Sequence, residues 1–306
     1  MATLKNKIDF AVIVCVNNAN PNGDPLNGNR PRVDYDGHGE LSDVCIKRKI
    51  RNRLMEAGHA IFVQSDDNRV DDYRSLRSRA EGELKGVDIK DDKKYRQAAC
   101  KKWIDVRGFG QVFAYTGSGK KGKAAKAKEG SEVGDGKAEG AGVSIGIRGP
   151  VSVHSAFSVA PVSDRISSIQ ITKSVSGEGD GTKRGSDTMG MKHRVDHGVY
   201  VFYGSMNPQL AEKTGFSDED AEAIKESLGM LFQNDSSSAR PEGSMEVHKV
   251  YWWKHNHKNG QYSSAKVHRS LKVEVKKGVT EPRSIDDYDI VLNELPALKP
   301  EVIDGV

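Results

Sequence analysis

The 306-residue chain carries 47 basic and 43 acidic side chains, and its formal net charge of +4 permits an acidic partner without requiring one. The chain is long enough to bury a full core in one elaborated domain or two, and the apolar run at residues 10–16 is too short to span a membrane, so we expect no membrane contact. Cys15, Cys45 and Cys100 are widely spaced and odd in number, which argues against a disulfide framework and against a cysteine zinc site. This cysteine usage favours a reducing cytoplasm.

The N-terminal part of the chain predicts a buried strand followed by a shaped loop. Residues 10–16 are apolar, and residues 17–32 contain Asn-Pro, Asn-Gly, Asp-Pro and a second Asn-Gly in succession. These dipeptides mark turns because Gly and Asn accept positive φ and Pro fixes φ near −65°. We therefore expect the loop to have a defined conformation.

A basic helix is predicted next. Ser42 and Asp43 are capping candidates, and the apolar residues Ile46, Ile50 and Leu54 recur at four-residue spacing after Val44. The remaining positions carry the cations Lys47, Arg48, Lys49, Arg51 and Arg53. Such a density of cations beside a Gly-rich loop suits a run of phosphates, and the alternative is a solvated basic face.

Two contrasting stretches follow the helix. A short strand is predicted at residues 61–64, and residues 65–111 are strongly charged with helical character, as in an insertion packed beside a core sheet. Residues 115–142 are a low-complexity tract of Gly, Lys, Ala and Glu, which buries too little apolar area to offset its ordering entropy. We expect a mobile loop there, with an electrostatic tether to nucleic acid as its functional interpretation.

The second half predicts strands and one further helix. A Ser217–Asp220 capping box opens an amphipathic helix that runs to residue 232. The strands are expected at residues 151–159 after a turn at 148–150, and at 166–172, 195–203 and 247–253. The order of elements is that of an α+β protein with a ferredoxin-like or RRM-like core and large insertions. The acidic tail, residues 285–306, is expected to pack over one edge.

Residues 162–194 predict a long, projecting hairpin. Its tip contains four glycines, each of which loses backbone entropy on ordering and adds no side chain to a core. Its return limb carries Met189, Met191, Lys192 and Arg194. A disordered surface loop is the alternative.

Histidines and tryptophans give weaker signals. His193 and His197 stand four residues apart, but on a strand and with no third ligand nearby they do not favour a metal site. Residues 255–257 (His-Asn-His) lie in a polar turn before Asn-Gly, which is typical of a hairpin. Trp252 and Trp253 should point to opposite faces of a strand, one into the core and the other available to a partner.

Several motifs together resemble a known family. These are residues 20–25 (Asn-Pro-Asn-Gly-Asp-Pro), 29–33 (Asn-Arg-Pro-Arg-Val), 46–51 (Ile-Lys-Arg-Lys-Ile-Arg), 146–151 (Gly-Ile-Arg-Gly-Pro-Val), 171–175 (Ile-Thr-Lys-Ser-Val) and 197–200 (His-Gly-Val-Tyr). The combination resembles the Cas-seven superfamily, and more narrowly its Csd-two branch, the backbone subunit of type I-C CRISPR Cascade complexes. The likeness covers most of the chain. Cys45 departs from the small hydroxyl residues common in related branches.

The resemblance implies a non-catalytic subunit that needs no cofactor, polymerises along a guide RNA and presents it to a target DNA strand. Its implied partners are the guide RNA, target DNA, copies of itself, and the guide-end-capping, large and small subunits of Cascade. It also implies one elaborated RRM-like domain over residues 1–306, with a fingers-like insertion at 65–145 and a thumb-like hairpin at 162–194. The implied RNA-binding residues are Arg30, Arg32, Ser42, Lys47, Arg48, Arg51, Lys173, Met189, Met191, Lys192 and Arg194.

Two alternatives remain open. Related backbone subunits of type III complexes cut RNA with an acidic loop residue, so the chain is alternatively a metal-assisted endoribonuclease that uses Asp24, Asp34 or Asp36. The other alternative is a generic basic protein with no defined nucleic-acid partner.

Overall fold

A computed structural model describes residues 2–115, 143–172 and 189–306. Residues 116–142 of the loop expected at 115–142, and residues 173–188 of the expected hairpin, including Lys173, lie outside the described residues. Within the described ranges, no helix is long and apolar enough to cross a membrane.

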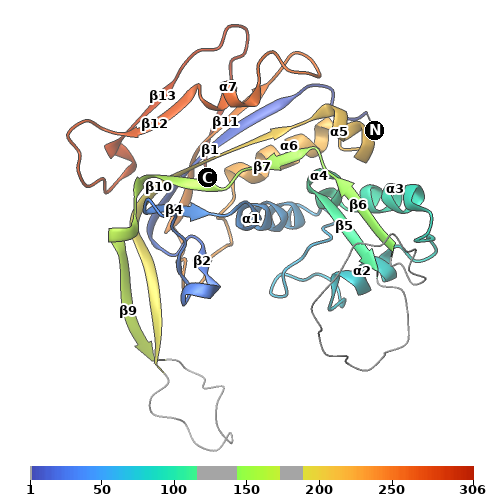
Figure 1. The fold of residues 1–306 in the computed structure, drawn as a ribbon, viewed down its shortest axis with the longest axis horizontal. Helices are drawn as coiled ribbons and strands as arrows, with labels where there is room; N and C mark the ends of the chain where they lie inside the picture. The colour runs from blue at the N-terminus through green and yellow to red at the C-terminus, as the bar shows by residue number, and fades with distance from the viewer. Residues whose placement is uncertain (1, 116–142, 173–188) are drawn as a thin grey trace, which may run out of the picture.

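One antiparallel sheet organises the molecule, in the order β14-β11-β1-β10-β8-β4, with β7 and β9 also pairing with β10 (Figure 1). Its strands are β1 (Ile8–Ala19), β4 (His38–Leu41), β7 (Val151–Val153), β8 (Ala156–Pro161), β9 (Ile166–Thr172), β10 (Met189–Met206), β11 (Met245–Lys254) and β14 (Glu301–Asp304). Helix α1 (Asp43–Glu56) follows β4, and α6 (Asp218–Gly229) lies between β10 and β11 along the chain. The α+β class is therefore confirmed, and the expected C-terminal packing on a sheet edge is seen in β14.

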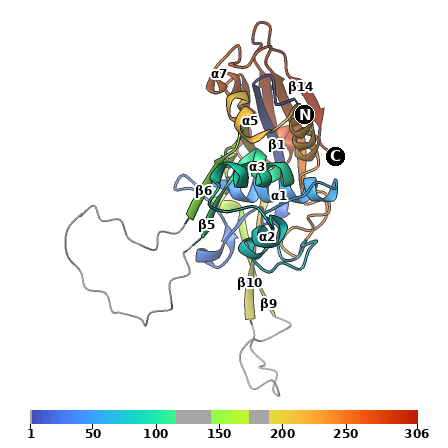
Figure 2. The ribbon, with the colours of Figure 1, turned by 90° about the vertical axis from the view of Figure 1, so that its right-hand side faces the viewer.

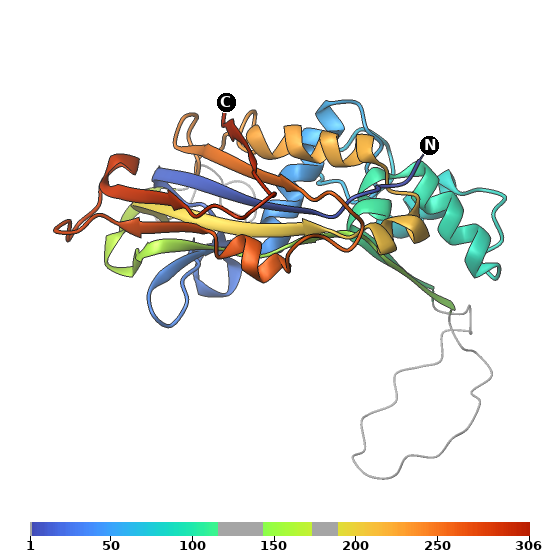
Figure 3. The same ribbon diagram turned by 90° about the horizontal axis from the view of Figure 1, so that it is seen from above.

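Alternation along β1 divides the core between the two faces of the sheet. Phe10, Val12 and Val14 pack in a cluster with α1 and α6, whereas Ala11 and Ile13 pack against the C-terminal elements on the other face. Those elements are α7 (Ser264–His268), β12 (Leu271–Val275) and β13 (Tyr288–Leu292). Figure 3 shows α6 and α7 on opposite sides of the sheet.

The two tryptophans follow the same division. Trp252 lies in the α1 and α6 cluster at 2% exposure, and Trp253 lies in the opposite cluster at 1%. The predicted split between faces is confirmed. The expectation that one ring is available to a partner is wrong, because the C-terminal elements cover the second face.

A second cluster lies beyond the C-terminal end of α1 (Figures 1 and 2). It is formed by α2 (Leu76–Glu83), α3 (Asp92–Lys102), α4 (Ile104–Phe109) and the hairpin of β5 (Gly110–Tyr115) and β6 (Val143–Arg148). The strand predicted at 61–64 is wrong. The buried carboxylate of Asp105 accepts hydrogen bonds from the backbone amides of Phe62 at 2.7 Å and Val63 at 3.0 Å, so these donors need no partner strand.

The other predicted elements differ in detail. The capping box of Ser217 and Asp220 is confirmed, although α6 ends three residues earlier than expected. The strand expected at 151–159 is two strands, β7 and β8, which pair with different parts of β10. A short helix, α5 (Pro208–Thr214), precedes α6.

The turn at residues 255–257 leads to α7 rather than to a returning strand, so the predicted hairpin is wrong. His255 is 1% exposed, its Nδ1 accepts from the backbone amide of Gln261 at 2.8 Å, and its Nε2 therefore donates to Asp9 Oδ2 at 2.8 Å. This buried pair ties the end of β11 to the start of β1.

Candidate nucleic-acid interface

The loop between β1 and α1 is shaped by its own side chains, as its turn residues predict. It contains β2 (Gly23–Asp24), a short 3-10 helix (Pro25–Asn27) and β3 (Arg30–Pro31), with Gly28 and Asn29 at positive φ of 57° and 61°. Asn22 Oδ1 accepts from both the backbone amide and the hydroxyl of Ser42 at 2.9 Å. Ser42 Oγ in turn accepts from the amide of Cys45 and caps α1. The loop is therefore anchored to the start of the helix.

The cations of α1 are held by protein groups. Lys47 pairs with Asp43 at 2.9 Å, and Arg51 donates from Nε to Asp105 at 2.9 Å. Arg48 donates to the carbonyl oxygen of Val63 at 2.6 Å. Lys49 pairs with Asp235, and Arg53 pairs with Glu56.

Burial separates these cations into two groups. The side chains of Lys49 and Arg53 are only 4% and 7% exposed, whereas that of Lys47 is 23% exposed. The alternative of a solvated basic face is therefore wrong for most of this helix. Burial also lowers the pKa of Arg48, and the neighbouring Arg51 adds to that effect.

Arg30 connects the loop to the base of the projecting hairpin. Its Nη1 donates to Ser168 Oγ at 3.4 Å, and Ser168 Oγ lies 2.7 Å from His193 Nδ1 across the β9–β10 pair. Because Ser168 accepts from Arg30, it can donate its proton to an unprotonated His193. Burial and the charge of Arg30 both lower the pKa of His193, which agrees with that arrangement.

The hairpin limbs are confirmed and project from the sheet (Figures 1 and 2), and their two faces differ. Met189 and Met191 share a face with His193, and are 52% and 55% exposed. Lys192 lies opposite Ile169 on the other face, which Arg194 and Ile171 also occupy. The structure therefore separates the two methionines from the two cations that the sequence analysis placed beside them.

The carboxylates of the loop aspartates accept hydrogen bonds from backbone amides, and one of them pairs with an arginine. Asp24 Oδ1 accepts from the amide of Leu26 at 3.1 Å and pairs with Arg32 at 3.4 Å. Asp34 Oδ1 accepts from the amides of Asp36 and His38 at 3.0 and 2.9 Å. In the described part of the chain, no group of three or more His, Cys, Asp or Glu side chains is placed to hold a metal ion.

His197 binds a different partner from His193. Its Nδ1 lies 2.7 Å from Asn17 Oδ1 and its ring is 6% exposed. The four-residue spacing therefore brings the two rings to separate polar contacts, His193 at Ser168 and His197 at Asn17.

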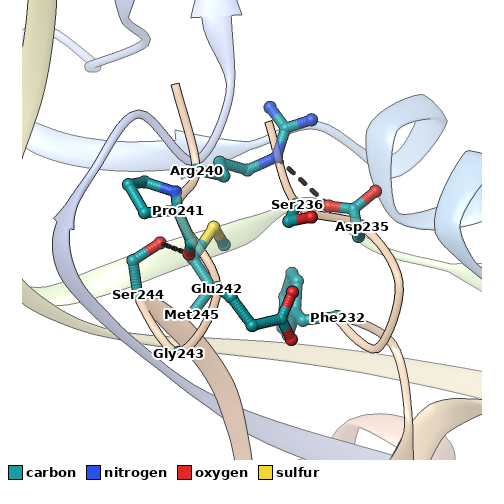
Figure 4. Close-up of a pocket in the computed structure, with 9 residues that line it drawn as sticks. All are labelled: Phe232, Asp235, Ser236, Arg240, Pro241, Glu242, Gly243, Ser244 and Met245. Atoms are coloured by element: carbon teal, nitrogen blue, oxygen red, sulfur yellow. Dashed lines mark hydrogen bonds and ion pairs between the residues drawn. The ribbon is translucent and has the colours of Figure 1, made fainter. Parts of the chain in front are cut away.

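One loop that the sequence analysis passed over lies against this region. Residues 230–244 connect α6 to β11, and the carbonyl oxygen of Ala239 accepts from the amide of Asn20 at 2.9 Å. Asp235 on this loop pairs with Arg240 (Figure 4) and also with Lys49 of α1, which the figure does not draw. The run Ser236-Ser237-Ser238-Ala239-Arg240 was the available signal, a polar run with one arginine between a helix and a strand.

Comparison with known proteins identifies the family. Residues 6–293 match the family described as CRISPR-associated protein Cas7, so the chain is a CRISPR-associated protein. It belongs to the Cas7 family. A CRISPR-associated protein Cas7 of Haloferax volcanii is 28% identical over 243 residues, which cover 78% of this chain and 67% of that protein.

Two solved structures are also similar to the chain. One is from a CRISPR RNA-guided surveillance complex in a pre-nicking state, with 15% identity, a TM-score of 0.45, and coverage of 90% of this chain and 84% of the other. The second is from a CRISPR RNA-guided surveillance complex, with 16% identity, a TM-score of 0.42, and coverage of 90% and 78%.

Proposed function

We propose that this chain is a guide-RNA-binding backbone subunit of a type I-C Cascade complex in the cytoplasm. In this proposal it polymerises head to tail along the guide, presents it for pairing with a target DNA strand, and does not cut nucleic acid itself. Its partners are then the guide RNA, copies of the chain, and the capping, large and small subunits. Membership of the Cas7 family and the motifs of the loop and α1 support the proposal.

The observation that carries it is the hydrogen-bonded connection from Arg30 through Ser168 to His193. It places the shaped loop beside the base of the projecting hairpin, on the face where Met189 and Met191 are exposed. A strand of RNA along this surface would meet cations that neutralise phosphates and apolar side chains that replace base stacking. We assign the thumb-like function to this hairpin and the fingers-like function to the insertion at 65–145.

The phosphate contacts divide according to exposure. Lys47, Arg30 and Arg32 are partly exposed and are assigned to guide phosphates. Arg48 and Arg51 are assigned both to guide phosphates and to shaping the surface, because each already donates to a protein oxygen. Ser42 is assigned to capping α1 and anchoring the loop.

The test is what copurifies with the protein when it is expressed beside a CRISPR array. Extracted nucleic acid of uniform, guide-like length that ribonuclease removes and deoxyribonuclease does not is the expected result. Heterogeneous RNA would instead support the generic basic protein. Absence of bound RNA, together with no binding of a synthetic guide at low salt, would overturn the proposal.

A further inference from the structure

The guanidinium of Arg240 contacts a carboxylate through Nε, and its two terminal nitrogens face away from that contact. Its Nε lies 3.1 Å from Asp235 Oδ2, and its side chain is 28% exposed. Figure 4 shows both terminal nitrogens pointing away from Asp235 and from the loop. Among the described residues, these terminal nitrogens have no hydrogen-bond partner. An arginine fixed through Nε presents its terminal N–H groups as a fork, which matches two oxygens of a phosphate.

The carboxylate that orients Arg240 is itself fixed by a buried cation. The side chain of Lys49 on α1 is buried, pairs with Asp235, and has its Nζ 5.1 Å from the ring centroid of Phe232. Burial lowers the pKa of Lys49, whereas Asp235 opposes that shift. Lys49 has little access to a ligand, so its charge acts through Asp235.

Positive charge gathers at this end of α1. The thiol of Cys45, the third residue of the helix, is under the electrostatic influence of Lys49, Arg240 and Arg32, against the single carboxylate of Asp235. Burial nevertheless dominates and raises the pKa of Cys45. Arg32 is paired with Asp24, whereas Lys49 and Arg240 share the single carboxylate of Asp235. That sharing leaves one positive charge in excess, which a phosphodiester can neutralise.

We propose that Arg240 binds a phosphodiester group of the RNA strand through its two terminal nitrogens, and that Asp235 is its positioning residue. The inference rests on the proposed function and extends the interface from the loop and α1 to residues 235–240. The exposed hydroxyls of Ser236, Ser237 and Ser238 beside Arg240 offer further neutral donors to the same backbone.

The test compares Arg240→Gln, Arg240→Lys and wild type on two single-stranded RNAs of equal length and unrelated sequence, over a series of salt concentrations. We expect Arg240→Gln to weaken both RNAs about tenfold, as for removal of one charge-assisted hydrogen-bonding group. The salt slope should fall by about 0.7, the value for one phosphate on a single strand. Arg240→Lys should recover the slope and only part of the affinity, because lysine keeps the charge and has no fork.

Lys258→Gln is the matched control. Lys258 pairs with one carboxylate, that of Glu212, and lies on the loop after β11, so its replacement changes the net charge equally. It should leave both the affinity and the slope at the wild-type values.

Asp235→Asn separates orientation from charge. The variant removes one negative charge. If Arg240 acts only through its charge, RNA should bind more tightly; if Asp235 must orient the guanidinium, RNA should bind more weakly. We expect RNA binding to weaken by a factor of about three to ten, because a freely rotating guanidinium makes a weaker charge-assisted hydrogen bond to the phosphate. A urea titration of the same preparation confirms that it is folded, and the Arg240 variants test the proposal independently of it.

The outcomes distinguish this inference from the proposed function. If wild type binds RNA and Arg240→Gln binds it equally with the same slope, the inference is wrong and the proposed function stands. If Arg240→Gln changes only assembly between copies, measured by sedimentation, Arg240 is a protein contact and the inference is wrong. If millimolar inorganic phosphate displaces RNA from wild type and this displacement is lost in Arg240→Gln, the site binds free anions rather than the RNA backbone, and the inference is wrong. A wild-type protein that binds no RNA at low salt overturns both proposals.

Discussion

Arg51 of α1 donates through Nε to Oδ2 of Asp105 at 2.9 Å, and this pair joins α1 to α4. Asp105 is 1% exposed and also accepts the amides of Phe62 and Val63. One carboxylate therefore satisfies three donors that lie 42 to 54 residues earlier in the chain. The surface that Arg51 and Arg48 help to form depends on this contact.

We expect Asp105→Ala to lower the free energy of unfolding by about 3 kcal/mol, because it leaves the half-buried Arg51 and the amides of Phe62 and Val63 without their acceptor. Urea unfolding of the purified protein measures the effect. Asp66→Ala, which removes an exposed carboxylate from the adjacent segment, is the control and should change stability by less than about 0.5 kcal/mol. Equal midpoints for the two variants would show that Asp105 does not stabilise the junction.

Lys47 and Arg51 should behave differently although both lie on the basic helix. Lys47→Ala should reduce the salt slope of RNA binding by about 0.7 while stability changes by at most about 1 kcal/mol, since its pair with Asp43 is partly exposed. Arg51→Ala should lower stability first, because it leaves Asp105 buried without its charge partner. Paired RNA-binding and urea titrations measure both effects. A stability decrease in Lys47→Ala with no change in RNA binding would contradict this division.

The two faces of the β9–β10 hairpin should have separate effects. Replacing Met189 and Met191 by Ala should weaken the periodic exposure of bound guide bases to chemical probes, because it removes the apolar groups that replace stacking. Replacing Ile169 and Ile171 by Ser on the other face should leave that pattern in place. The matched pair of double variants removes two exposed apolar side chains in each case. If both double variants weaken the pattern equally, the position of the methionines on their face of the hairpin does not explain the base exposure.

Stability should fall when the pH drops below about 6.5. Burial lowers the pKa of His197, helped by Arg165 and opposed by Asp287, and burial also lowers the pKa of His268. Between the lowered folded pKa and the ordinary 6.5, the unfolded chain binds protons that the folded chain does not, so stability is complete above 6.5 and decreases below it. Urea midpoints at pH 7.5 and 5.5 measure this dependence. His197→Gln should make it shallower, and an unchanged dependence would rule out His197 as a contributor.

We expect no cleavage of guide RNA or of complementary RNA by the purified protein with Mg²⁺ or Mn²⁺. The carboxylates of Asp24 and Asp34 are already used for a helix cap, an ion pair and a turn. Denaturing gels of end-labelled RNA give the readout. Cleavage that is abolished by Asp24→Asn, Asp34→Asn or Asp36→Asn would instead establish the metal-assisted endoribonuclease.

Local patterns predicted much of the fold. The capping box of Ser217 and Asp220 and the alternation along β1 depend on residues close in sequence, so both could be inferred before the structure. The alternation rule was also sufficient to separate Met191 from Lys192, since neighbours on a strand point to opposite faces. The expectation that these two side chains lie together is therefore wrong, although the sequence contains the signal that separates them.

Contacts between distant segments could not be predicted in the same way. The amides of Phe62 and Val63 are satisfied by Asp105, some 40 residues later, so residues 61–64 carry the composition of a strand without its partner. Arg240 and Lys49 meet at Asp235 only after α6 has returned the chain to α1. The sequence showed that the cations were present and could not show which carboxylates held them.

β10 runs without a break from the exposed hairpin at Met189 to the buried sheet at Met206, so the side-chain alternation of the hairpin limb is linked to that of the core. Deleting a single residue from this limb between Met191 and Val195 would move the methionines to the face now held by Lys192, whereas deleting two would shorten the limb and keep its faces. Natural variants of the β9–β10 hairpin are therefore expected to differ in length by an even number of residues in each limb. A hairpin that is lengthened or shortened by design should gain or lose residues two at a time in each limb.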